Sequence, residues 1–339
     1  MDTKELCLEL AGAIGISGDE TSACEKARFI LGRYADTHID RMNNVIGRIE
    51  GKGKKFLLDA HIDQIGLIVR GINDKGFVLF DKCGGVDPRT LIGCEVTVLG
   101  KVPLFGVVCS VPPHLAGDDD SLPEITKMAI DIGYDKEEAE KLVFPGDRII
   151  LKNRQAELLG SKLSSAAFDD RAGVAVLIKA TEILVSEGFN ADLTVMLSSQ
   201  EEVGCRGAVT GSFNNQADEA IVVDVTFATQ PNVGKEDGGE LGGGPLIGFS
   251  PVLDRKMSLD LVETAKKHNI PHSCEVMGRS TGTNADKISL SAGGIRTATV
   301  SVPLRNMHTA VEVIDTDDIE NAAKLIAYYI LENGGKENV

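Results

Sequence analysis

The spacing of hydrophobic and polar residues changes along the chain, and each spacing predicts a different kind of structure. In the first 35 residues, apolar side chains recur at helical spacing, which predicts helices over residues 2–13 and 18–35. Ser17 lies three residues before Glu20, and this spacing predicts a capping box at the start of the second helix. The chain is therefore expected to begin with two helices, the second with one buried face.

A short apolar run follows these helices. Residues 43–47 have the composition of a turn that leads into a strand. Residues 56–60 form a mostly apolar run of the length expected for a strand buried on both faces. The run ends in His61-Ile62-Asp63, which places two polar side chains directly after buried sequence. We mark this tripeptide as a candidate part of a site.

Between about residues 66 and 155 the pattern changes to short runs of Val, Ile, Leu and Phe separated by Gly, Asp and Pro. Such runs are typical of a small β domain. One helix is expected at 135–142, opened by a capping box from Asp135 to Glu138. The predicted strands of this domain are 66–69, 76–81, 94–99, 104–111 and 147–151.

Strands and helices alternate in the remainder of the chain. The predicted helices are 172–186, 256–268 and 314–332, and the predicted strands are 193–197, 220–223 and 297–301. This alternation predicts an α/β fold with a mostly parallel central sheet flanked by helices, into which the small β domain is inserted. A chain of 339 residues also exceeds the size at which a single core usually stops growing, so two domains are expected.

Composition and charge narrow the classes of partner. The formal net charge of -16 disfavours nucleic acid and anionic membrane, so a small or peptide-like ligand is the better expectation. No apolar stretch is long enough to cross a bilayer, and we expect no signal peptide. The seven cysteines are scattered and never spaced Cys-x-x-Cys, which disfavours a disulfide framework or a zinc ribbon. These features favour a reducing compartment and a cytoplasmic protein.

Two adjacent carboxylates, Glu201 and Glu202, come directly after the apolar run at 193–197. Neighbouring glutamates repel each other, so a fold that brings both to an interior site needs positive charge there. A metal centre is the obvious source of that charge. Seen alone, the pair could equally be a solvated Glu-Glu at the end of a strand.

Other candidate ligands also come at or near the ends of predicted elements. They are His61, Asp224, His308 and, just before the helix at 172, Asp169. In an open α/β sheet the carboxyl ends of the parallel strands share one edge, so these side chains are expected to meet there. Two imidazoles and several carboxylates suit Zn²⁺, Mn²⁺ or Co²⁺ and lack the thiolates of a structural zinc site.

Each candidate has a less specific explanation when it is taken singly. His61-Ile62-Asp63 could be a surface turn, although Asp63 is close enough to accept the second ring N–H of a metal-bound His61. Asp169-Asp170-Arg171 could be a helix N-cap with an ion pair, and His308 alone indicates nothing. The joint pattern favours a metal site, because the ends of five elements would otherwise each need a separate explanation.

Seven segments of the chain together resemble one family, the tetrahedral-type aminopeptidases. This family of dinuclear metallopeptidases also includes glutamyl and deblocking aminopeptidases and members labelled cellulase M. The resemblance extends over nearly the whole chain, and the set of motifs is highly specific when taken together. The segments are 59–66 (DAHIDQIG), 84–88 (GGVDP), 167–171 (AFDDR), 200–208 (QEEVGCRGA), 224–226 (DVT), 242–245 (GGGP) and 305–308 (RNMH).

The resemblance implies a zinc-exopeptidase-like fold and a site with two divalent metal ions, most readily Zn²⁺ or Co²⁺, with Mn²⁺ as a further choice. Asp169 would bridge the two ions. His61 and His308 would each contribute an imidazole, and Glu202 and Asp224 would complete the two ligand sets. Residues 1–65 and 156–339 would form the catalytic domain, and 66–155 a lid and oligomerisation domain.

The same resemblance implies the remaining roles. Glu201 would be the general base that takes a proton from the metal-bridging water and passes it to the departing amine. Asp63 would orient His61. The substrates would be peptides, and the subunits would assemble into dimers and, in some members, dodecameric cages.

The chain departs from the usual family pattern at a few positions. Family members usually have Glu where this chain has Gln64 and Asp where it has Asn284. They also have Tyr and Ser-Pro around the last histidine, where this chain has Asn306 and Thr309-Ala310. None of these is an implied metal ligand, so the departures bear on substrate preference and on the level of activity.

Three functions are compatible with these observations. The first is a metal-dependent aminopeptidase that removes N-terminal residues from peptides. The second is a weakly active or non-catalytic binding or scaffold protein on the same fold, which the departures at Gln64 and Asn284 motivate. The third is a glycosidase that uses a carboxylate pair, which leaves His61, His308 and Asp169 without a role.

Overall fold

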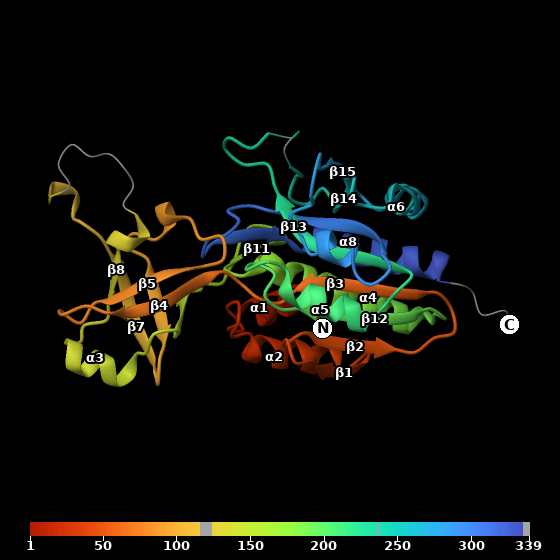
Figure 1. Cartoon of the computed structure of the whole chain (residues 1–339). Helices are drawn as coiled ribbons and strands as arrows, with labels where there is room; N and C mark the ends of the chain where they lie inside the picture. Colours follow the sequence, from red (N-terminus) through yellow and green to blue (C-terminus); the bar gives the residue numbers. More distant parts are fainter. Residues whose placement is uncertain (116–123, 235, 237, 335–339) are drawn as a thin grey trace.

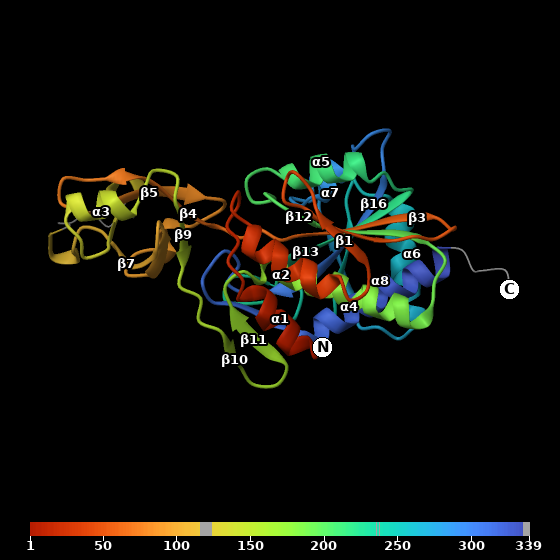
Figure 2. The same ribbon diagram turned by 90° about the horizontal axis from the view of Figure 1, so that it is seen from below.

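The protein has two parts that lie end to end, a sheet covered by helices and a small β-barrel (Figure 1). The computed structural model describes residues 1–115, 124–234, 236 and 238–334. In both views the barrel is set apart at one end of the molecule, and the chain enters and leaves it through neighbouring segments (Figures 1 and 2). An inserted β domain is therefore confirmed, whereas its proposed lid and assembly roles stay predictions.

The larger part is built on a mixed sheet of eight strands. Its four central strands are parallel to one another, and the outer pairings β1–β2, β2–β12 and β14–β16 are antiparallel. The predicted mostly parallel α/β sheet is thus confirmed. The strands in spatial order are β1 (Asp36–Ile39), β2 (Val45–Ile49), β12 (Asp192–Ser198), β3 (Lys55–His61), β13 (Glu219–Phe227), β16 (Arg296–Leu304), β14 (Leu246–Phe249) and β15 (Ser273–Val276).

Helices cover both faces of this sheet (Figure 2). One face packs against α1 (Thr3–Ala11), α2 (Thr21–Leu31), α4 (Phe168–Glu187), α6 (Arg255–Lys267) and α8 (Thr316–Asn333). The other face packs against α5 (Arg206–Asn214) and α7 (Ala285–Ile288). Because side chains alternate along a strand, Phe56 and Leu58 of β3 enter the larger core while Leu57 enters the smaller one.

This alternation decides where the polar residues of β3 point. Asp59 and His61 follow Leu57 at intervals of two residues, so they share its face of the sheet. Asp59 confirms this placement, because its carboxylate accepts a hydrogen bond from the side chain of Asn284 at the start of α7. The apolar positions of β3 therefore fix the direction of its last side chain, His61.

The smaller part is a closed barrel with a core of its own. Gly106 allows two of its strands to pack closely, since a Cβ there would lie 2.5 Å from Cγ2 of Ile130. The helix α3 (Lys136–Leu142) begins as predicted, with Asp135 accepting the backbone N–H of Glu138. The barrel strands in spatial order are β4 (Gly66–Ile72), β5 (Val78–Cys83), β8 (Ala129–Asp131), β7 (Pro103–Cys109), β6 (Glu95–Leu99) and β9 (Arg148–Leu151).

Several elements differ from the sequence predictions. The capping box at Ser17 is wrong, because α2 begins at Thr21 and the Ser17 hydroxyl donates to the carboxylate of Asp63 at 2.6 Å. A three-stranded sheet of β10 (Ala156–Glu157), β11 (Lys162–Ser165) and β17 (Glu312–Asp315) was not predicted. Three short 3₁₀ turns complete the described elements: η1 (Pro88–Thr90), η2 (Pro113–Leu115) and η3 (Ile125–Lys127). None of the helices in the described part of the chain is long and apolar enough to span a membrane.

Candidate metal centre

Six of the seven residues singled out for a site lie around one cavity of about 1000 Å³. They are His61, Asp169, Glu201, Glu202, Asp224 and His308. The strand register brings them together, because Ser198 at the end of β12 lies beside His61 at the end of β3. Asp224 lies within β13 rather than after it, since that strand continues to Phe227. Asp63, the seventh, is fully buried behind this wall.

Asp169 lies between the two imidazoles, with one carboxylate oxygen toward each. Its Oδ1 is 3.0 Å from Nε2 of His61, and its Oδ2 is 3.2 Å from Nε2 of His308. Glu202 extends the cluster on one side, with Oε1 3.3 Å from Nε2 of His308. On the other side, Oδ1 of Asp224 is 3.9 Å from Nε2 of His61. Ligand atoms that share a tetrahedral metal at bond lengths of about 2.1 Å are separated by roughly 3.4 Å, so these spacings suit metal ligands.

The second ring nitrogen of each histidine is held by a backbone carbonyl. Nδ1 of His61 donates to the carbonyl of Asp63 at 3.0 Å, a shorter contact than the 3.5 Å to the Asp63 carboxylate. Nδ1 of His308 donates to the carbonyl of Gly85, also at 3.0 Å. Nε2 of each ring faces the carboxylates. Hydrogen bonds with Asp169 and Glu202 raise the pKa of His308 to about 11. Burial alone would lower the pKa of His61, but contacts with Asp169 and Asp63 outweigh burial and raise it. A bound metal ion would take the place of the proton on Nε2.

Asp63 holds the glutamate pair more directly than it holds the histidine. Its Oδ1 accepts the backbone N–H of Glu201 at 2.9 Å, and its Oδ2 accepts that of Glu202 at 3.2 Å. The hydroxyl of Ser17 supplies a third hydrogen bond. Although burial alone would raise the pKa of Asp63, contacts with His61 and these donors lower it.

Glu312 supports the other half of the cluster, and the sequence reasoning missed it. Its two carboxylate oxygens accept the backbone N–H of His308 at 2.9 Å and of Asp169 at 3.1 Å. Asp170 was also missed as a participant: its Oδ2 accepts the backbone N–H of His61, and its Oδ1 accepts that of Gly173. The sequence offers no distinctive local signal for Glu312, because it is the first residue of β17, a four-residue strand that also ends in a carboxylate, Asp315.

The cluster carries more negative charge than the protein itself balances. Burial raises the pKa of Glu201, Glu202 and Asp224, because a desolvated carboxylate favours its neutral form. The nearby guanidinium of Arg171 is buried, but it donates to the carbonyls of Ile62, Leu10 and Ala13 rather than to these carboxylates. Positive charge from a ligand would remove this imbalance.

The donor set fits divalent metal ions. Ligand atoms of His61, Asp169 and Glu202 lie within 4.8 Å of one another, as do those of His61, Asp170 and Asp224. Imidazole and carboxylate donors without thiolate suit Zn²⁺, Co²⁺ or Mn²⁺. An α/β sheet with this cluster at its carboxyl edge is the arrangement expected of a metallohydrolase.

The chain belongs to the M42 glutamyl aminopeptidase family, whose sequence model matches residues 43–325. It is 34% identical to the lysyl aminopeptidase of Pyrococcus furiosus over 329 residues, which cover 95% of this chain and 94% of that protein. The resemblance drawn from the motifs is therefore confirmed. The chain is a metallo-aminopeptidase, and its metal identity and the number of ions stay predictions.

Solved structures agree with this assignment. The aminopeptidase APDkam598 of the archaeon Desulfurococcus kamchatkensis superimposes with a TM-score of 0.92 at 33% identity, with 99% of each chain covered. The TET1 peptidase of Pyrococcus horikoshii superimposes with a TM-score of 0.87 at 32% identity, covering 98% of this chain and 100% of that one. That peptidase is described as assembling into a tetrahedron or a large octahedral shell.

Proposed function

We propose that this chain removes N-terminal residues from peptides with two divalent metal ions, Zn²⁺ or Co²⁺ in first place and Mn²⁺ next. The observation that carries the proposal is the position of Asp169, whose two oxygens face two separate imidazoles. His61 and Asp224 would hold one ion with Asp169, and His308 and Glu202 would hold the other. When bound, such ions polarise a peptide carbonyl and lower the pKa of water at the site.

Glu201 is the proposed general base. Its side chain lines the cavity but stands outside both groups of residues that could hold a metal. Oε1 of Glu201 lies 3.2 Å from Sγ of Cys205, which donates to it, and the backbone N–H of Glu201 is fixed by Asp63. The carboxylate can therefore take a proton from water at one oxygen and deliver it to the amine that leaves.

Asp63 acts in this proposal as a positioning residue for both halves of the reaction. Its backbone carbonyl orients the ring of His61, and its carboxylate fixes the backbone of the glutamate pair. The metal ligand and the base are thus held by one buried side chain and its own peptide group.

We also propose that the subunits form homo-oligomers in the cytoplasm, with dimers as building blocks and a dodecamer as one assembly. The shells described for the Pyrococcus horikoshii relative support this proposal. The barrel would act as the lid and assembly domain, since Gly85 at its border with the sheet domain contacts the ring of His308. Light scattering of the purified chain would measure the assembly.

Metal content and a substrate panel test the function. The protein is treated with EDTA, reloaded with Zn²⁺, Co²⁺ or Mn²⁺, and assayed with aminoacyl and acylated substrates. Failure of every reloaded form to cleave any of them would refute the peptidase and favour the scaffold, which the departures at Gln64 and Asn284 motivate. Turnover of cello-oligosaccharides that survives metal removal would instead support the glycosidase.

A further inference from the structure

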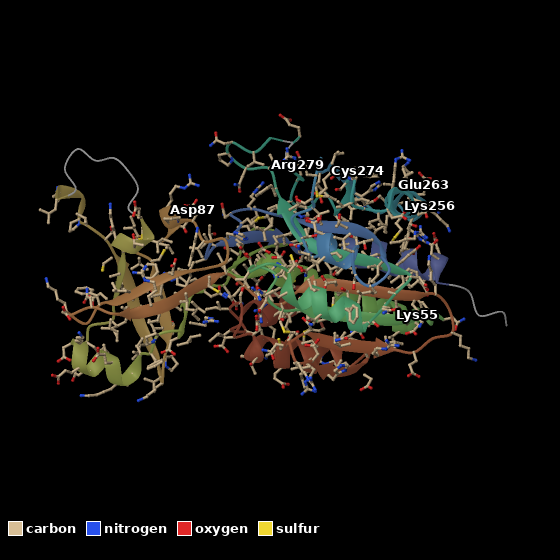
Figure 3. The ribbon with its side chains drawn as sticks, in the orientation of Figure 1. Lys55, Asp87, Lys256, Glu263, Cys274 and Arg279 are labelled. Carbon is tan, nitrogen blue, oxygen red and sulfur yellow. The ribbon has the colours of Figure 1, made fainter. Side chains whose placement is uncertain are left out.

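The cavity that holds the metal cluster extends to a second acidic group, Glu275 of the outer strand β15. Figure 3 labels the residue before it, Cys274, at the edge of the sheet domain away from the barrel. Ser301 and Thr226 tie Glu275 to the strands of the metal site. The Ser301 hydroxyl donates to Oε1, and the Thr226 hydroxyl donates to Oε2 at 2.8 Å.

These two contacts place Glu275 close to the reaction site. Ser301 is paired with Asp224 in the parallel register of β13 and β16. Thr226 lies two residues beyond Asp224 on the same face of β13, an advance of roughly 6.6 Å along a strand. A side chain that extends from a substrate residue bound at the cluster therefore comes within reach of Glu275.

The charge of Glu275 has no cationic partner among the described side chains. Burial raises the pKa of Glu275, and the two hydroxyl donors oppose this rise. Lys287 is the one lysine or arginine among the described residues that line the cavity. Its positive charge acts on Cys205, beside Glu201, where it works to lower the pKa of the thiol. A carboxylate offers about four lone-pair positions, so acceptor sites remain beside the two hydroxyls.

Apolar side chains line the same cavity as Glu275. They include Leu246, Phe227 and Met277, and Met277 follows Glu275 by two residues. Such a wall suits the aliphatic stem of a lysine or arginine, which packs on apolar surface while its charged head reaches a polar partner. An acidic substrate residue would instead bring a second carboxylate against Glu275 and be repelled.

We infer that Glu275 selects peptides whose N-terminal residue carries a long basic side chain, through an ion pair between that side chain and its carboxylate. This inference rests on the proposed aminopeptidase function and names its substrate class. It departs from the acidic preference that the description of the family as glutamyl would suggest, and it agrees with the description of the Pyrococcus furiosus relative as a lysyl aminopeptidase.

The test uses p-nitroanilides of lysine, arginine, norleucine and glutamate with the metal-reloaded full-length protein. Norleucine has the aliphatic stem of lysine without the charge. We expect kcat/KM for lysine to exceed that for norleucine by about 10- to 100-fold, the range of a hydrogen bond to a charged group, and glutamate to be the poorest substrate. Glu275→Gln should remove the lysine advantage and leave norleucine turnover within about threefold, since the amide keeps the shape of the site.

Glu263→Gln is the matched control, because it makes the same change at an exposed position of helix α6 (Figure 3) and should leave every ratio unchanged. Equal turnover of lysine and norleucine by the unaltered protein would overturn the inference. An equal loss for both substrates in Glu275→Gln would also overturn it, because that result marks a structural carboxylate. If Glu275→Gln does not fold, the same assay is made with Glu275→Asp. Its shortened carboxylate should lower kcat/KM for lysine more than for norleucine.

A binding measurement separates this inference from the proposed function. Calorimetry with lysinamide and norleucinamide on the metal-loaded Glu201→Gln protein needs no turnover. Tighter binding of lysinamide by about tenfold or more, lost in the double variant with Glu275→Gln, would support the basic preference even if no substrate is cleaved. Equal binding of the two amides would refute it even if peptides are hydrolysed.

Discussion

Exchange of either glutamate of the adjacent pair for glutamine should separate metal binding from proton transfer. Glu202 lies in the ligand cluster, with Oε1 3.3 Å from Nε2 of His308. Glu201 stands outside that cluster, and its carboxylate accepts a hydrogen bond from the thiol of Cys205. Glu202→Gln therefore replaces a charged ligand by a neutral one, whereas Glu201→Gln leaves the ligand set intact.

The expected magnitudes follow from these contacts. Loss of a residue that only supports a metal ligand lowers metal affinity by about 10- to 100-fold. Glu202→Gln alters a ligand itself, so we expect it to lower metal affinity by at least the same factor. Loss of a general base lowers kcat by about 10²- to 10⁴-fold, or about 3 to 5 kcal/mol in the activation barrier. Glu201→Gln should change folding stability little, because the amide has the same shape and its oxygen can still accept from Cys205.

The assay measures metal per subunit by plasma mass spectrometry after desalting, and kcat for one aminoacyl p-nitroanilide at saturating Zn²⁺ or Co²⁺. Glu187→Gln is the control, because this carboxylate is exposed at the end of α4. We expect Glu201→Gln to match the control in metal content and to lose turnover, and Glu202→Gln to lose metal. Equal metal loss in the two variants would refute the assignment of separate roles.

Three further perturbations test the surroundings of the site. Asp63→Ala leaves three buried donors without their acceptor. We therefore expect a loss of about 3 kcal/mol or more in the free energy of unfolding, measured by denaturation, and weaker metal binding, measured by metal titration. Unchanged values would contradict the role given to Asp63. Gly85→Ala should displace the ring of His308, because the new Cβ would lie 2.6 Å from its Cε1, and a variant with full metal content would argue against this contact. Burial raises the pKa of Asp318 to about 6 from the model-compound value of 3.8. Between about pH 4 and 6 the folded protein keeps a proton that the unfolded chain releases. This group therefore lowers the free energy of unfolding by up to about 3 kcal/mol as pH rises from about 4 to 6. Denaturation midpoints measured across this range should show the dependence in the unaltered protein and lack it in Asp318→Asn.

The sequence was most informative where a buried strand ends in a polar residue. His61 and the glutamate pair could be found because the runs before them are apolar and short, and the parallel register then places their strand ends side by side. Asp169 could be placed on the same edge by its position before a helix. The pattern of apolar residues thus predicted the four central strands and the location of these side chains, whereas the outer strands β1, β14 and β15 were not predicted.

The supporting residues could not be found in this way, because their partners are distant in sequence. Glu312 and Asp169 are 143 positions apart, and the pairing depends on β17, which joins a small sheet that no local pattern predicts. Ser17 has the spacing of a helix cap, but its hydroxyl donates instead to the buried carboxylate of Asp63, because a charged acceptor makes a stronger hydrogen bond than a neutral one. In each case a tertiary contact overrides or adds to the local signal.

The barrel is inserted next to two residues that hold the metal site, Asp63 and Gly85. The chain enters the barrel directly after Asp63, and Gly85, just beyond β5, comes back to contact the ring of His308. A rigid displacement of the barrel would therefore pull at once on the residue that fixes the glutamate pair and on the carbonyl that orients the second imidazole. Because Asp63 and Gly85 also hold residues of the metal site, movement of the barrel relative to the sheet is expected to disturb that site.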